Sequence, residues 1–153
     1  MTAVLVVSTL SGCGACEIYK RSEHSKLLKM IHESNLPITV EMITYSSFDR
    51  AREELPIGLN PQVRDYAAWF PTFALFPQAL LNDDREQLEG VVLGGKVVRH
   101  DGQLTIVRQE PTFDPKVVYE WLVKKINKPL FIDQEMIHHQ QFAVKVKKGN
   151  RKA

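Results

Sequence analysis

Two cysteines stand three positions apart, at Cys13 and Cys16, and they are the chain's two cysteines in 153 residues. A disulfide between them would close so short a loop that it would scarcely restrict the unfolded chain. A secreted scaffold held together by disulfides needs more cysteines than this. A thiolate attacks disulfide sulfurs, and a second thiol beside it can then release the product. The spacing therefore favours a redox function for the pair.

Zinc binding and loss of reactivity are the other interpretations of this pair. A zinc site takes about four ligands, and the histidines offer no paired His-x₃₋₅-His spacing to complete one. We therefore expect no metal, and a relic pair of unreactive thiols stays open as an alternative. The chain's five histidines are His24, His32, His100, His138 and His139.

A strand, a long helix and a second strand are predicted around the two cysteines. Residues 3–9 are an apolar run typical of a buried central strand, and residues 14–34 are good helix formers without proline. Residues 38–45 are β-rich and follow Pro37, which blocks the helix. This order is a βαβ unit. The helix is expected to bury Leu27, Leu28 and Ile31.

The start of this helix predicts different roles for the two thiols. If Cys13 caps the helix, its sulfur faces unpaired N–H groups and the positive end of the macrodipole, which favour the thiolate. Cys16 then lies in the first turn and faces inward. We expect Cys13 to attack a disulfide and Cys16 to resolve the mixed disulfide.

The remaining sequence predicts further elements of an α/β fold. Short helices are expected over residues 48–55 and 62–69, and an aromatic strand over residues 70–77. Two β-rich runs, 91–93 and 96–98, flank Gly94-Gly95 and predict a hairpin about it. A strand over 104–107 and a helix capped by Asp114 and running to residue 127 complete the chain, the helix burying Val117, Val118, Trp121, Leu122 and Ile126.

The Cys-Gly-Ala-Cys motif at a strand-to-helix junction resembles the active site of the thioredoxin superfamily. Phe70-Pro71-Thr72 is the second matching motif, because a cis proline in that superfamily faces the cysteine pair and the residue before it binds the substrate backbone. The resemblance covers residues 3–127. It implies a three-layer α/β fold with a central mixed sheet of four or more strands, flanking helices, insertions and a C-terminal extension. It implies Cys13 and Cys16 as catalytic residues, the Cys13–Cys16 disulfide as the redox group in place of a cofactor, and a substrate surface of Gly12, Gly14, Ala15, Phe70 and Pro71.

Several positions depart from the pattern of thioredoxins proper. Gly12 replaces the usual tryptophan, and Val7 replaces the buried aspartate beneath the pair. The chain enters directly on the motif strand, as glutaredoxins do, yet Lys96 follows Gly94-Gly95 where glutaredoxins have an acidic helix start that holds glutathione. Dependence on glutathione does not follow from these residues. They indicate a divergent member of the superfamily, for which a viral origin is one alternative.

Charge divides the chain into a domain, residues 1–127, and a basic extension, residues 128–153. The extension has six Lys/Arg against two Asp/Glu, a net charge of +4, so the domain has 14 against 16, a net of −2. The extension could keep the terminus solvated or bind an acidic partner, and nucleic acid is not the expected one. No run of eighteen apolar residues predicts a transmembrane segment.

We therefore expect a thiol–disulfide oxidoreductase that acts on protein disulfides. Reduction is the default direction because residues 3–10 lack the basic leader of an export signal. The expected location is the cytoplasm, or a virion if the protein is viral. The alternative is a thioredoxin-fold structural or adaptor subunit of a larger assembly, anchored by its basic extension.

Overall fold

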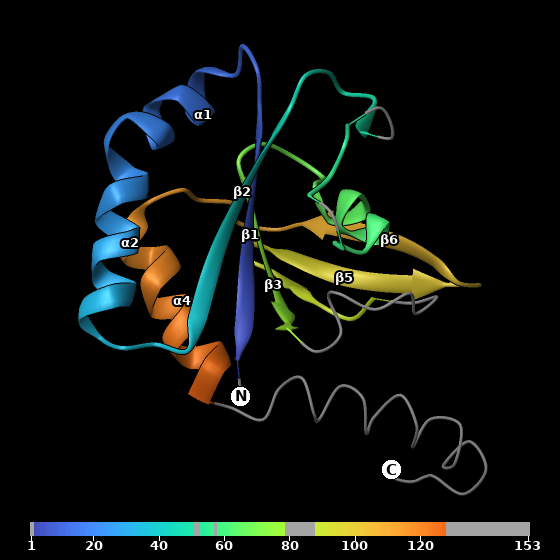
Figure 1. The fold of residues 1–153 in the computed structure, drawn as a ribbon. Coiled ribbons are helices and arrows are strands. Elements are labelled where there is room, and N and C mark those ends of the chain that lie inside the picture. The colour runs from blue at the N-terminus through green and yellow to red at the C-terminus, as the bar shows by residue number, and fades with distance from the viewer. Residues whose placement is uncertain (1, 51–52, 57, 79–87, 128–153) are drawn as a thin grey trace, which may run out of the picture.

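The computed structural model describes residues 2–50, 53–56, 58–78 and 88–127, and shows an α/β fold (Figure 1). A mixed sheet has the strand order β2-β1-β3-β4, and a second, two-stranded sheet joins β5 and β6. The described elements are β1 (Ala3–Leu10), α1 (Gly14–Ile18), the π-helical turn η1 (Tyr19–Glu23), α2 (His24–Glu33), β2 (Ile38–Tyr45), the 3₁₀ helix η3 (Pro61–Tyr66), β3 (Thr72–Pro77), β4 (Val91–Val92), β5 (Gly95–His100), β6 (Gln103–Arg108) and α4 (Pro115–Asn127).

Strand β1 lies in the middle of the mixed sheet, and all eight of its residues are buried. It pairs in parallel with β2 from Ala3↔Ile38 to Leu10↔Tyr45, and antiparallel with β3 as far as Ser8↔Thr72. The continuous apolar run of β1 matches burial on both faces. The predicted strand, helix and strand over residues 3–45 are confirmed.

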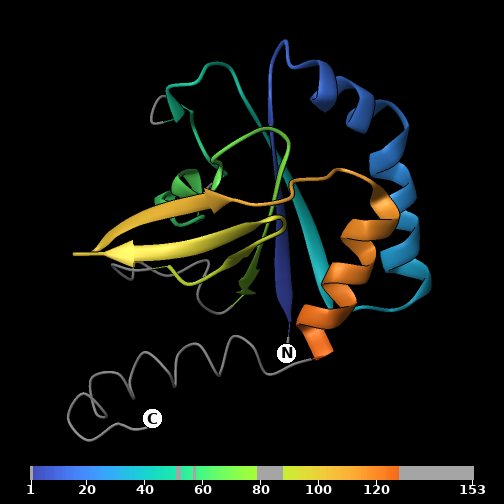
Figure 2. The same cartoon turned by 180° about the vertical axis from the view of Figure 1, so that it is seen from behind.

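Helices cover one face of the mixed sheet, where α2 and α4 lie side by side (Figure 2). The predicted buried face of each helix was too wide, because Leu28 is 39% exposed and Val117 is 40% exposed. Leu28 follows the fully buried Leu27, and Val117 precedes the fully buried Val118. A helix that packs on one side buries only a narrow stripe of its surface. The Asp114 carboxylate accepts the Lys116 N–H at 3.0 Å, which confirms the predicted cap of α4. The core on this face contains Ala3, Leu5, Val7, Tyr19, Leu27, Ile31, Ile38, Phe73, Leu75, Leu93, Val118 and Leu122.

The opposite face of the mixed sheet is covered by η3 and by the β5–β6 hairpin, which projects away from the helices (Figures 1 and 2). The helix predicted over residues 62–69 is a 3₁₀ helix that begins at Pro61 and ends at Tyr66. Its cap is Asn60, whose side chain accepts the Gln62 N–H at 2.9 Å. The α-helix predicted over residues 48–55 is wrong for the described part of that segment, where Arg50 is in 3₁₀ conformation and the other residues form bends or irregular backbone.

The hairpin predicted about Gly94-Gly95 is also wrong. Strand β4 pairs with β3, whereas β5 pairs with β6 through the turn Asp101-Gly102. Both turn residues have positive φ, 52° and 81°, as the tight turns of two-residue hairpins require. The Gly94 turn instead passes the chain from one sheet to the other, and its carbonyl accepts the N–H groups of Gln109 and Glu110 at 2.8 and 3.1 Å.

The predicted basic extension, residues 128–153, lies outside the described part of the chain. Among the described residues, none of the helices has both the length and the apolar character needed to cross a bilayer.

Replacing Gly94 by alanine should destabilise the fold more than replacing Gly102. Both have positive φ, but a Cβ at Gly94 would lie 2.5 Å from the Glu110 carbonyl oxygen, whereas the space beside Gly102 is open. Backbone atoms cannot turn aside as a side chain can, so we expect Gly94→Ala to lose about 1–3 kcal/mol more of the free energy of unfolding than Gly102→Ala. Urea denaturation of both variants measures this difference, and equal losses would contradict the described turn.

Candidate active site

Cys13 lies where β1 turns into the first helix. The Cys13 N–H donates to the Leu10 carbonyl at 3.2 Å, and Gly12 makes the turn with a φ of 82°. Cys13 is the N-cap of α1, with φ −83° and ψ 120°, and its sulfur accepts the Cys16 N–H at 3.2 Å. The predicted position of Cys13 at a helix start is confirmed. The α1, η1 and α2 segments continue one another without a break, so the sulfur meets the positive end of a long helical segment.

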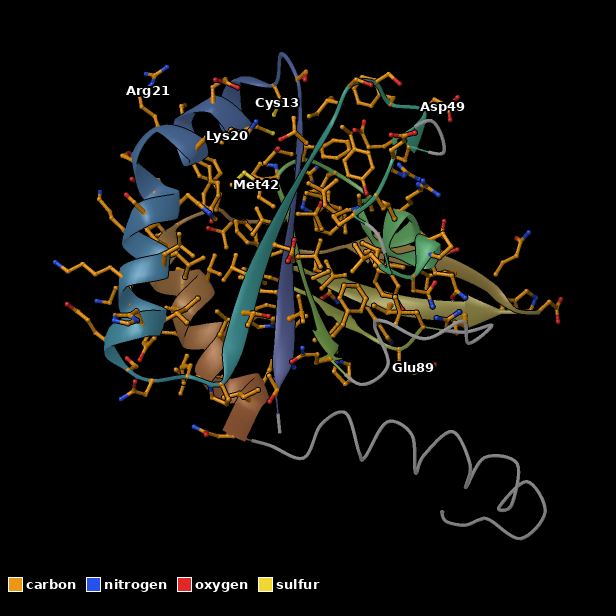
Figure 3. All side chains as sticks on the ribbon, in the orientation of Figure 1. Cys13, Lys20, Arg21, Met42, Asp49 and Glu89 are labelled. Carbon is orange, nitrogen blue, oxygen red and sulfur yellow. The ribbon has the colours of Figure 1, made fainter. Side chains whose placement is uncertain are left out.

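The carbonyl oxygen of Phe70 is the second group at the Cys13 sulfur, at 3.7 Å. The Phe70-Pro71 peptide bond is cis, as predicted. Strands β1 and β3 are antiparallel, so the residues before Thr72 meet the residues after Ser8 at one end of the sheet. This pairing brings together two motifs that are 57 positions apart. Figure 3 shows Cys13 at this end of β1, while Arg21, further along the helix, extends away from the sheet.

Cys16 is fully buried, whereas Cys13 is half-buried, and both are free thiols. The Cys16 sulfur accepts the Leu10 N–H at 3.4 Å. The pKa of the Cys16 thiol is raised to about 11, first by burial and then by hydrogen bonding with the Cys13 side chain, against smaller lowering by the Leu10 N–H and the positive charge of Lys20. Cys16 is therefore a protonated thiol at neutral pH.

The predicted substrate surface is open around the motif. A Cβ added at Gly12 or Gly14 would meet no heavy atom within 4 Å. Ala15 and Phe70 are half-buried, and Pro71 is buried. Gly12, Gly14 and Ala15 adjoin Cys13 along the chain, and Phe70 reaches its sulfur through the carbonyl, with Pro71 buried next to it.

Val7 stands where the resemblance to thioredoxins would place a buried aspartate. It is fully buried in the apolar core beneath the helices. The positive charge of Lys20 lowers the pKa of Cys16. Among the described residues there is also no group of three or more His, Cys, Asp or Glu side chains that could hold a metal ion.

Sequence reasoning missed an aromatic cluster beside the site. The Phe70 ring packs against Tyr45, with centroids 5.6 Å apart, and against Phe48, with centroids 6.4 Å apart. Tyr45 ends β2, which is parallel to β1, so the residues after it reach the end of the sheet where Cys13 lies. That parallel pairing was the available signal for Phe48. Phe73 and Phe76, from the predicted aromatic strand, are buried in the core.

Comparisons with known protein families, with curated proteins and with solved structures found no match to this chain. What the site can do chemically therefore follows from its own geometry. It has an accessible thiol at a helix start, a buried thiol beside it and a backbone carbonyl at the first sulfur.

Alkylation by iodoacetamide should distinguish the two thiols. In the Cys16→Ser variant we expect Cys13 to react readily at pH 7.5. In the Cys13→Ser variant we expect Cys16 to react at least about 100-fold more slowly, because its full burial limits access of the reagent and raises the pKa of the thiol.

The rate for Cys16 should then rise as the pH rises above 9, since ionisation supplies the reactive thiolate. Mass spectrometry of the intact protein measures both rates, and urea-unfolded samples of each variant serve as the control. Equal rates in the folded variants and the same pH dependence would contradict the described difference in burial.

Proposed function

We propose that this protein is a thioredoxin-like thiol–disulfide oxidoreductase that acts on protein disulfides. The observation that carries the proposal is the position of the Cys13 sulfur, which accepts the Cys16 N–H and lies beside the carbonyl that precedes the cis bond to Pro71. The sheet order β2-β1-β3-β4, with β2 parallel and β3 antiparallel to β1, is compatible with a thioredoxin-like layout. The β5–β6 hairpin is then an insertion before the last helix.

The first step is attack on a substrate disulfide. The Cys13 thiolate forms a bond to one substrate sulfur, and the substrate S–S bond breaks. The second substrate sulfur leaves with the electron pair and takes a proton from solvent. The Phe70 carbonyl can accept an N–H from the substrate backbone, which would hold the chain in line with the Cys13 sulfur.

The second step forms the Cys13–Cys16 disulfide. Cys16 loses its proton and attacks the Cys13 sulfur, and the first substrate sulfur leaves as a thiolate that is then protonated. The Leu10 N–H and the positive charge of Lys20 favour the transient Cys16 thiolate. The substrate gains two electrons and two protons, the enzyme loses them, and an external dithiol must restore the reduced pair.

A non-enzymatic adaptor subunit is the second candidate function. The high pKa and full burial of Cys16 favour it, since a resolving thiol has to ionise. Reduction of insulin disulfides in the presence of dithiothreitol separates the two candidates. The oxidoreductase should precipitate insulin faster than dithiothreitol alone, and an adaptor should not.

Serine substitutions at the two cysteines should have different consequences. We expect Cys13→Ser to lower the insulin reduction rate to that of dithiothreitol alone, because the attacking sulfur is gone. Cys16→Ser should lose turnover as well but accumulate a covalent adduct with a disulfide substrate, because nothing resolves the mixed disulfide. Intact mass spectrometry, with and without reductant, detects the adduct.

Ser25→Ala is the matched control, because Ser25 is exposed on α2, which continues the helical segment that Cys13 caps. This variant should keep the wild-type rate. Equal insulin reduction by the wild type and both cysteine variants would refute the oxidoreductase proposal.

A further inference from the structure

Phe48 is the most exposed of the large apolar side chains in the described part of the chain, at 77%. Single exposed apolar residues are common on protein surfaces and need no function. This one packs on Phe70, whose carbonyl oxygen lies at the Cys13 sulfur. A single residue, Phe70, therefore lies between the exposed Phe48 ring and the Cys13 sulfur.

Hydrogen bonds hold the backbone on both sides of Phe48. The Ser46 N–H donates to the Glu53 carboxylate at 2.9 Å, and the Asp49 N–H donates to the Ser47 hydroxyl at 3.2 Å. The ring is thus presented by a segment with its own local contacts. Tyr45, just before this segment, is fully buried against Phe70 and fixes where the segment starts.

A groove of about 400 Å³ opens beside the Phe48 ring. Two guanidinium groups and two carboxylates among its lining residues leave no net charge, so the groove does not select a side chain by the sign of its charge. A phenyl ring, a proline and guanidinium groups all offer faces on which an aromatic ring packs. The lining residues are Phe48, Asp49, Arg50, Pro61, Arg64 and Asp65.

Arg64 is held in place at the wall of this groove. One nitrogen of its guanidinium donates to the Glu53 carbonyl, and its buried Nε atom is out of reach of a molecule in the groove. Arg64 therefore contributes a fixed wall beside Phe48 and no free donor.

We propose that Phe48 and this groove form a specificity subsite that binds an aromatic side chain of the protein substrate near its disulfide cysteine. The inference rests on the proposed function and adds the substrate class. In an extended chain, side chains two residues apart lie on one side and are separated by about 7 Å. Phe70 contacts both the Cys13 sulfur, through its carbonyl, and the Phe48 ring. We therefore test an aromatic residue two positions from the cysteine that Cys13 attacks, the nearest position on the same side of the extended chain.

The test uses peptides that carry one cysteine as a mixed disulfide with 2-mercaptoethanol, so that the leaving group is small and the same throughout. One peptide has Phe two positions before the cysteine, one has Phe two positions after it, and one has Ala at both places. The full-length Cys16→Ser variant traps each peptide on Cys13, and intact mass spectrometry gives the rate of adduct formation at low peptide concentration.

We expect one of the Phe peptides to react about tenfold faster than the Ala peptide, which corresponds to about 1.4 kcal/mol. Adding Phe48→Ala to the Cys16→Ser variant should bring the ratio of the two adduct rates close to one. Adding Phe48→Trp instead should keep the ratio. Val107→Ala is the matched control, because Val107 is also exposed, at 46%, but lies on β6 outside the groove. It should leave the ratio unchanged.

The outcomes separate this inference from the proposed function. If all three peptides form adducts at the same rate on the Cys16→Ser variant that keeps Phe48, the subsite proposal is wrong and the oxidoreductase proposal stands. If the ratio survives Phe48→Ala, aromatic selection does not come from this groove. If no peptide forms an adduct although the protein is folded, the proposed function itself fails.

Discussion

The hydrogen bond from the Cys16 N–H to the Cys13 sulfur is the interaction on which the site depends. It exists because a fully buried strand ends at Leu10, a glycine with positive φ turns the chain, and the helix starts at the next residues. The same short segment gives the two sulfurs opposite surroundings. Cys13 faces N–H groups and solvent, and Cys16 faces the core. Moving the helix start by one residue would remove this difference and, with it, the division of work between the thiols.

The high pKa of Cys16 comes first from burial, which is the same in every redox state, and then from the Cys13 side chain, which is not. Two of the causes that raise it, hydrogen bonding with the Cys13 side chain and the charge on Cys13, require a free Cys13 thiol or thiolate. Once Cys13 is bonded to a substrate sulfur, both causes are removed, and the Leu10 N–H and Lys20 continue to lower the pKa of Cys16. The proposed mechanism therefore has Cys16 protected before the substrate binds and easier to ionise afterwards. This offers a physical substitute for the buried carboxyl that Val7 cannot provide.

Local patterns in the sequence predicted the parts of the site that local forces build. The apolar run before Leu10, the cysteine at a helix start and the proline after Phe70 each have a direct structural meaning, and the structure contains all three. The patterns failed where pairing partners decide. Gly94-Gly95 looks like a hairpin turn, but the positive φ angles of Asp101 and Gly102 make the better one. No hydrophobic periodicity in the sequence marked Phe48 as a residue of the site. The path of its segment depends on a hydrogen bond between the Ser46 N–H and Glu53, seven residues later.

The segments that depart from a minimal layout converge on Phe70. On one side, the segment after β2 places Phe48 against the Phe70 ring. On the other, the base of the β5–β6 hairpin packs on Trp69, where Gly95 leaves room for the indole and the Arg108 guanidinium lies 5.7 Å from the centre of that ring. The first segment thus contacts Phe70, whose carbonyl faces the Cys13 sulfur, and the second contacts Trp69, the residue before it. Under the proposed function Phe70 positions the substrate chain, so changes in these two segments would alter which chain is bound and leave the chemistry of the thiols unchanged.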